Sequence, residues 1–356
     1  MRRIVFALAA VVVALAATLG AVELTLRLFN YPPPAFSPWI ADRSTGFRFA
    51  PNVHERMVRP EYDVLVETNA EGFRDDPVEK KSGFRILLLG DSFASGYGVE
   101  RGQLFADIVE KRLGVEVVNA GVGGWEIVQQ VHFFAERGGS LEPDLVVYAL
   151  YLANDLTRNG EWIEGKNNSL RSRVRHYPVR VTHGFKLVQL FHSAVYHLRA
   201  RGAQARGEWR PFPDYLEVCR RRLSATGRRD YSEVRELLGR LRSEVRDAGA
   251  RLFVVTFPFR TAVEDDARER LAATIPDFSA TYDLHRPVRE VARILQDLHI
   301  DHMDVGGALR RSYRSTGKPL YFRVDGHLNV LGHRVFADAL APALEKKIAP
   351  SRGPGR

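Results

Sequence analysis

Ser92 stands in the run Gly90-Asp91-Ser92, directly after the apolar segment 85–90, where its hydroxyl could act as a nucleophile. Such a serine needs a base that accepts its proton, and donors that stabilise the oxyanion formed when it attacks an ester. We expect Asp91 to cap the turn that follows rather than to react. Glycine-rich turns after buried strands also bind phosphates, but the chain has no GxxxxGK[ST] motif.

The C-terminal phrase Val324-Asp325-Gly326-His327-Leu328-Asn329 holds the best candidate for the base. A neutral imidazole titrates near the working pH, so His327 suits the transfer of the Ser92 proton. Asp325 would accept the other imidazole N–H and fix the tautomer. An ordinary turn and cap before the last helix is the alternative interpretation of this phrase.

Two other polar loops offer donors for an oxyanion hole. The run Asn119-Ala120-Gly121-Val122-Gly123-Gly124 ends in a glycine whose N–H a substrate can approach closely, since no Cβ is present. Asn154 could add its side-chain amide, and Ser92 its own N–H. Taken singly, Gly124 and Asn154 are more often turn residues than oxyanion donors.

These loops need a scaffold that brings them together. Alternating strand and helix patterns from residue 84 onward predict a parallel sheet covered on both faces. The expected strands are 85–90, 115–118, 144–152, 251–257 and a short one near 300–305. The expected helices are 103–113, 125–137, 231–248, 287–298 and 331–347. Ligands bind at the carboxyl ends of such strands, so the polar loops should converge there.

The four blocks together resemble those of the SGNH (GDSL-type) hydrolase family over residues 84–347, apart from an insertion. Gly90-Asp91-Ser92 resembles its first block, Gly124 its second, Asn154 its third, and Asp325 with His327 its last. The resemblance implies a flavodoxin-like three-layer α/β/α fold and acyl transfer without a metal, and we expect no cofactor. The common last block is Asp-x-x-His, whereas Asp325-x-His327 resembles variants of some exported members.

The N-terminal segment, residues 1–29, reads as a signal anchor or a signal peptide. Residues 4–22 are apolar and uncharged, and nineteen residues can just cross a bilayer. We expect a retained anchor, with a cleaved signal peptide or a buried helix as alternatives. Arg2 and Arg3 would stay in the cytoplasm, which places the rest of the chain in the periplasm or outside the cell.

Residues 30–81 are expected to form a spacer and an irregular elaboration of the main domain. Pro32-Pro33-Pro34 is a stiff spacer. The similar phrases Thr45-Gly46-Phe47-Arg48 and Glu71-Gly72-Phe73-Arg74 read as glycine turns with an aromatic anchor. The hydrolase domain would span 82–348, and 349–356 would be a disordered tail.

An insertion at 155–228 interrupts the alternation and could form a lid, with a helix expected at 186–199. Residues 156–229 carry 16 Lys or Arg against 5 Asp or Glu, a surplus of +11, so the rest of the +9 chain sums to −2. With an export signal, we expect anionic lipid headgroups or an acidic glycan as partners and no nucleic acid, and a solvated basic face is the alternative.

The composition, 45% hydrophobic and 27% charged over 356 residues, is that of a globular protein, and its one cysteine, Cys219, excludes an intrachain disulfide. His299 and His302 lack the spacing of a zinc site, so no metal is expected.

The leading hypothesis is a membrane-attached esterase that cleaves O-acyl, especially O-acetyl, esters of a glycan through an acyl-enzyme. An O-acetyltransferase, a lipase or lysophospholipase, and a non-catalytic glycan-binding or scaffold protein are the alternatives.

Overall fold

The computed structural model describes residues 2–29, 38–157, 159, 186–188, 190–191, 198 and 213–348. The expected proline spacer, most of the 155–228 insertion with its helix at 186–199, and the 349–356 tail lie outside the described residues.

A five-stranded parallel sheet forms the centre of the molecule, in the order β6-β5-β7-β8-β9. Its strands are β5 (Arg85–Gly90), β6 (Glu116–Asn119), β7 (Leu145–Tyr151), β8 (Arg251–Phe257) and β9 (Asp301–Asp304). Every residue of β5 and β7 is buried, as expected for strands covered on both faces. The strand order reverses between β5 and β7, and such a switch point opens a crevice at the carboxyl ends of the strands.

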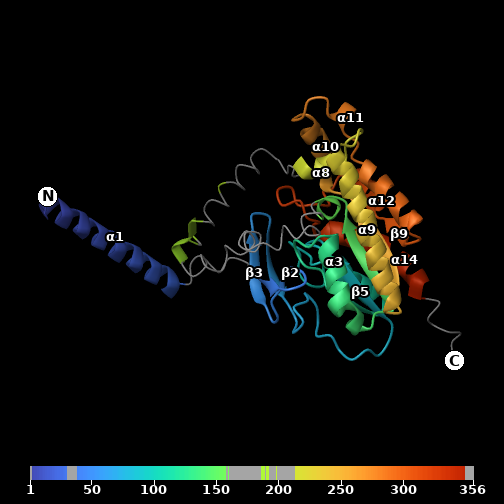
Figure 1. The fold of residues 1–356 in the computed structure, drawn as a ribbon, viewed down its shortest axis with the longest axis horizontal. Coiled ribbons are helices and arrows are strands. Elements are labelled where there is room, and N and C mark those ends of the chain that lie inside the picture. The colour runs from blue at the N-terminus through green and yellow to red at the C-terminus, as the bar shows by residue number, and fades with distance from the viewer. Residues whose placement is uncertain are drawn as a thin grey trace.

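Helices cover both faces of this sheet (Figure 1). One group contains α2 (Phe105–Leu113), α13 (Gly306–Thr316) and α14 (Val330–Ile348). The other contains α3 (Ile127–Phe133), α9 (Ala225–Asp247) and α12 (Arg286–Asp297). The expected flavodoxin-like three-layer fold is therefore confirmed.

Several helix boundaries differ from the expected ones. Helix α9 begins at Ala225 rather than at residue 231, because the Ser224 hydroxyl caps it by accepting the Gly227 N–H at 3.0 Å. Helix α3 gives way to a π-helical turn, Phe134–Gly138. Helix α13 was not expected, and neither were the shorter α8 (Pro213–Glu217), α10 (Asp265–Ala272) and α11 (Phe278–Thr281).

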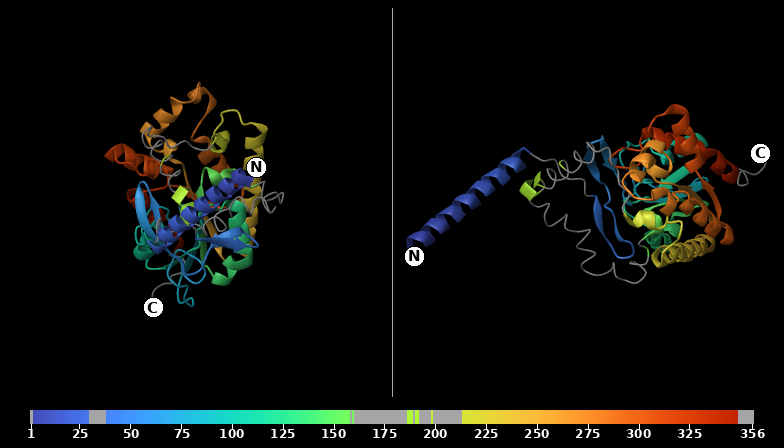
Figure 2. Two further views of the ribbon diagram at one scale, coloured as in Figure 1. Left: turned by 90° about the vertical axis from the view of Figure 1, so that its left-hand side faces the viewer. Right: turned by 90° about the horizontal axis from the view of Figure 1, so that it is seen from above.

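The expectation of an irregular segment before residue 81 was wrong, because two antiparallel hairpins occupy it. They are β1 (Trp39–Asp42) with β2 (Gly46–Phe49), and β3 (His54–Arg59) with β4 (Tyr62–Glu67). In β4, alternate residues are buried and exposed, a period of two that sends one face into the protein. Both hairpins lie on the side of the core from which the N-terminal helix extends (Figure 2).

Helix α1 (Arg2–Leu28) extends away from the folded body (Figures 1 and 2). Its segment Ala9–Leu28 has a mean hydropathy of 2.1 and none of it is buried. The helix is long and apolar enough to cross a membrane, a property that signal sequences share.

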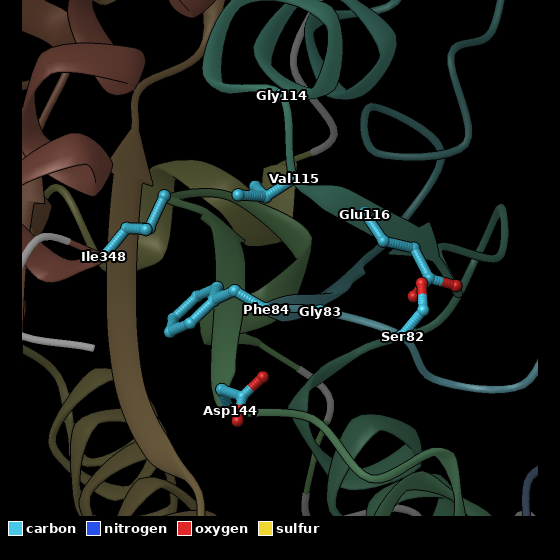
Figure 3. Close-up of a pocket in the computed structure, with 8 residues that line it drawn as sticks. All are labelled: Ser82, Gly83, Phe84, Gly114, Val115, Glu116, Asp144 and Ile348. Atoms are coloured by element: carbon cyan, nitrogen blue, oxygen red, sulfur yellow. The ribbon is translucent and has the colours of Figure 1, made fainter. Parts of the chain in front are cut away.

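A cavity of about 450 Å³ lies at the amino ends of the strands (Figure 3). Phe84, Val115 and Asp144, each the residue immediately before a strand, line it together with Ile348. It is therefore on the opposite edge of the sheet from the polar loops expected to carry the chemistry.

Candidate active site

Ser92, His327 and Asp325 form a continuous hydrogen-bonded line. Ser92 is the second residue after β5, and His327 lies in the loop that precedes α14. The His327 Nε2 atom lies 2.7 Å from Ser92 Oγ, although 235 residues separate the two in the chain. On the other side of the ring, His327 Nδ1 makes a short contact with Asp325 Oδ1. A hydroxyl, an imidazole and a carboxylate in this order can transfer a proton away from the hydroxyl.

The local backbone explains how the Asp-x-His spacing works. Gly326 has a φ of 85°, a left-handed conformation that glycine adopts without steric cost. This turn between Asp325 and His327 is closed by the Phe322 N–H, which donates to His327 O at 2.8 Å. Two side chains only two residues apart can therefore reach each other on the same side of the loop.

Charge and burial oppose each other at this pair. Burial by itself would raise the pKa of the Asp325 carboxyl, but the nearby His327 charge and hydrogen bonds from His327 and Tyr62 outweigh it, so the pKa is lowered. For His327, burial would lower the pKa, but the charge and hydrogen bond of Asp325, and the charge of Asp91, raise it. The arrangement therefore stabilises an imidazolium paired with a carboxylate.

Asp91 lies beneath the site rather than in the hydrogen-bonded line. Its Oδ1 accepts the Phe93 N–H at 2.9 Å, so the carboxylate caps the turn that presents Ser92. Burial raises the pKa of Asp91 to about 6, against the lowering effect of that hydrogen bond. Burial and the charge of Asp91 also raise the pKa of neighbouring Asp155.

The loops after β6 and β7 contact each other at the carboxyl end of β5. Gly124 is exposed and has a φ of 89°, which disfavours any residue with a side chain there. Asn154, half-buried after β7, has its Nδ2 atom 3.5 Å from Trp125 O and 3.3 Å from Asp155 Oδ1. The structure thus places Asn154 next to the Gly124 loop. The Val122 N–H also donates to Gly90 O at 3.1 Å, which ties that loop to the end of β5.

Side chains that the sequence did not point to hold these loops in place. Arg74 is buried and donates to the carbonyl oxygens of Ser95 at 2.9 Å and Val99 at 2.7 Å, in the segment after Ser92. Burial lowers its pKa to about 10. Its only sequence signal was the repeated Gly-Phe-Arg phrase. Nothing in the sequence pointed to Glu61 or Tyr62, which form hydrogen bonds with Asp325.

The acidic group formed by Asp75, Asp107 and Glu110 is the one set among the described residues with metal-ligand spacing. The Arg101 guanidinium lies 3.5 Å from Asp75 and 3.6 Å from Asp107, which balances part of their charge. Within the described part of the chain, no hydrogen bond or ion pair joins these residues to Ser92 or His327.

A family model described as "SGNH hydrolase-like domain, acetyltransferase AlgX" matches residues 220–355. The matched part contains Asp325 and His327, whereas Ser92, Gly124 and Asn154 precede it. The resemblance to SGNH hydrolases is thereby confirmed for this part of the chain. So is the expected class, an SGNH-type enzyme that acts on ester bonds.

Among solved structures, the chain is similar to the acetyl xylan esterase AlAXEase, with 13% identity, a TM-score of 0.43, and 73% of this chain and 99% of that one covered. A catalytic mutant of the acetylxylan esterase Axe2 from Geobacillus stearothermophilus is similar at 16% identity and a TM-score of 0.40, covering 73% and 94%. A lipase/acylhydrolase from Enterococcus faecalis has 13% identity and a TM-score of 0.40, covering 74% and 96%. The curated proteins give no match.

Proposed function

We propose that this chain is a serine esterase, held at the outer side of a membrane, that cleaves O-acyl esters of a polysaccharide or glycoconjugate. Acetyl is the acyl group we expect. The single observation that carries the proposal is the 2.7 Å contact between His327 Nε2 and Ser92 Oγ. A base within hydrogen-bond reach of a hydroxyl, itself oriented by a carboxylate, is the arrangement that activates a serine.

In the proposed reaction, Ser92 Oγ attacks the acyl carbon while His327 Nε2 takes the hydroxyl proton. The sugar oxygen then leaves and receives that proton, so that an acyl-serine and a free sugar hydroxyl result. Water attacks the acyl-serine in the same way, with His327 as the base, and releases a carboxylic acid. Asp325 keeps the imidazole in the tautomer that leaves Nε2 free to accept.

The oxyanion of each tetrahedral intermediate would be held by the Ser92 and Gly124 N–H groups and the Asn154 amide. The Asn154 Nδ2 contact with Trp125 O, at 3.5 Å, is at the long limit of a hydrogen bond. If the Asn154 N–H turned from Trp125 O to an oxyanion, it would therefore lose only a weak hydrogen bond. The exposed Gly124 lies where a substrate could reach its N–H.

A polysaccharide O-acetyltransferase that uses the same acyl-serine is the second candidate. The description of the matching family model, which names an acetyltransferase, favours it. The two functions differ only in whether water or a sugar hydroxyl accepts the acetyl group. Acetate release from an acetylated glycan, compared with acetyl gain by a deacetylated glycan when p-nitrophenyl acetate is the donor, separates them. A lipase would instead become more active as the acyl chain lengthens.

Replacement of the nucleophile tests the proposal directly. We expect Ser92→Ala to abolish p-nitrophenyl acetate hydrolysis in a protein that still folds, because one half-buried hydroxyl is removed. Ser82→Ala is the matched control, since Ser82 is exposed at the opposite edge of the sheet and should leave the rate unchanged. A Ser92→Ala protein as active as the wild type would remove Ser92 from the reaction.

A further inference from the structure

The β3–β4 hairpin reaches the carboxylate of Asp325 from outside the main domain. Tyr62, the first residue of β4, donates its hydroxyl hydrogen to Asp325 Oδ2 at 2.9 Å, although the two lie 263 residues apart in the chain. The other oxygen, Oδ1, contacts His327 Nδ1. Each carboxylate oxygen therefore has its own side-chain partner, and only one orientation of the carboxylate plane satisfies both.

The tyrosine ring is held firmly enough to fix that orientation. Only 9% of Tyr62 is exposed, and its ring packs against Phe322, with the ring centroids 4.9 Å apart. Gly98 provides the room on one side, because a Cβ there would lie 3.0 Å from the Tyr62 ring. A hydroxyl on a buried, packed ring positions its partner better than one on a mobile side chain.

Glu61, next to Tyr62 in the same hairpin, fixes the backbone of the loop that carries Asp325. Glu61 accepts the N–H groups of Arg323 at 2.7 Å, Val324 at 2.8 Å and Asp325 at 2.8 Å. Three donors on one carboxylate leave the loop little freedom to shift. The hairpin thus positions both the main chain and the side chain of Asp325.

We infer that Tyr62 is a positioning residue for the proposed acyl transfer, acting on Ser92 through Asp325 and His327. The inference rests on the proposed function. When His327 takes the Ser92 proton, the imidazolium is stabilised only if the carboxylate faces it. Without the tyrosine hydroxyl, Oδ2 loses its donor in a partly buried site, and the carboxylate is held only through Oδ1, which fixes its rotation less well.

The test is Tyr62→Phe in the full-length protein, purified in detergent, with p-nitrophenyl acetate as substrate. This change removes one hydroxyl and keeps the packed ring. We expect kcat to fall about tenfold while KM stays within twofold. Tyr313→Phe is the matched control: Tyr313 donates to Asp266 Oδ1 at 2.8 Å, a similar bond between α13 and α10, and its loss should leave kcat unchanged.

A double-mutant cycle separates positioning from general destabilisation. In an Asp325→Ala background, Tyr62→Phe should cause no further loss, because the group on which the hydroxyl acts is gone. A purely structural role predicts the same fractional loss in both backgrounds. Such an additive result, or a Tyr62→Phe protein as active as the wild type, would overturn the inference.

An NMR measurement, which does not depend on turnover, tests the role of Tyr62 separately from the esterase activity. The proton between His327 Nδ1 and Asp325 should give a downfield NMR resonance that moves in Tyr62→Phe and not in Tyr313→Phe. If Ser92→Ala retains activity but this resonance moves, the esterase proposal fails and the positioning of Asp325 stands. If Ser92→Ala is inactive while Tyr62→Phe changes neither the resonance nor kcat, the Tyr62 inference alone fails.

Discussion

Asp325 and His327 set each other's ionisation, and this has a consequence for the pH dependence of catalysis. Only the neutral imidazole can accept the Ser92 proton, so kcat/KM should rise with pH as His327 loses its proton. Because the pKa of His327 is raised, the midpoint of that rise should lie above the ordinary imidazole value of about 6.5.

Asp325→Asn removes the charge that raises the His327 pKa. We expect the acid limb of kcat/KM against pH to move to lower pH, and kcat to fall on the order of 10²- to 10⁴-fold because the tautomer is no longer fixed. Asp297→Asn, at an exposed aspartate that pairs with Arg235 on the helical surface, should change neither quantity. A limb that does not move would show that Asp325 does not govern the ionisation of His327.

His333 is fully buried, unlike His327, and its role is structural. Its Nδ1 accepts the Phe105 N–H at 3.2 Å, which requires that nitrogen to be unprotonated. Burial, and then the charges of Arg74 and His327, lower its pKa to about 3. Between pH 3 and about pH 6.5, the His333 imidazole is protonated in the unfolded chain but stays neutral in the folded protein. Its contribution to stability is therefore complete above pH 6.5 and is lost as the pH falls toward 3.

His333→Gln should weaken this pH dependence, because glutamine stays neutral and its carbonyl oxygen can still accept the Phe105 N–H. The wild type should lose about 2 kcal/mol more of its unfolding free energy than the variant between pH 7.5 and pH 5. Urea unfolding of both proteins at the two pH values measures the difference. Equal losses would mean that His333 does not contribute to acid sensitivity.

At the scale of elements, the loop at 320–329 is held from two sides by carboxylates. Glu61 binds it from the β3–β4 hairpin. Glu264, at the start of α10, accepts the Leu320 N–H at 2.8 Å and forms a buried ion pair with Arg260 at 2.7 Å. The loop therefore depends on two elements that are distant from each other in the sequence.

Glu61→Ala should loosen the contact between the β3–β4 hairpin and the loop at 320–329. Three N–H groups lose their acceptor, so we expect a loss of about 2 kcal/mol in unfolding free energy and a roughly tenfold lower kcat. Asp63→Ala is the control from the same hairpin, because Asp63 is exposed and pairs with Arg56 on the surface. Thermal unfolding and p-nitrophenyl acetate kinetics of both variants check this. Identical effects of the two changes would contradict a specific role for Glu61.

At the scale of the whole molecule, the chain between the N-terminal helix and the active site is short. Nine residues, 30–38, separate Phe29 from Trp39, whose indole N–H donates to Gly123 O at 3.2 Å. Ten Cα–Cα steps span at most about 35 Å. If α1 stays in the membrane, the loop that carries Gly124 is therefore confined to the neighbourhood of the bilayer.

A rigid spacer tests this confinement. Eight EAAAK repeats inserted between Phe29 and Asn30 would add about 60 Å where helical. We expect an unchanged rate with soluble p-nitrophenyl acetate, and at least tenfold slower deacetylation of a short acetylated saccharide attached to lipid in the same vesicle. Equal rates with the lipid-attached substrate would mean that α1 does not set the reach of the site.

The sequence was sufficient to predict the three-layer core of the fold, and the reason is physical. Strands buried on both faces must be continuously apolar, so β5 and β7 were recognisable from composition. The hairpin strands β3 and β4 were missed because each has only six residues and β3, with the sequence HERMVR, shows no regular alternation of apolar and polar residues. The start of α9 was missed although Ser224 is a good capping residue.

For the candidate site, the sequence determined which residue types are present and that they follow strands of one sheet. Only the tertiary structure decided their partners: which nitrogen of His327 faces Ser92, and that Tyr62 and Glu61 reach the Asp325 loop. The reason is that a hydrogen bond depends on positions to within a few tenths of an ångström. Such positions follow from how a hairpin docks on a distant loop, and no local pattern of residues encodes that.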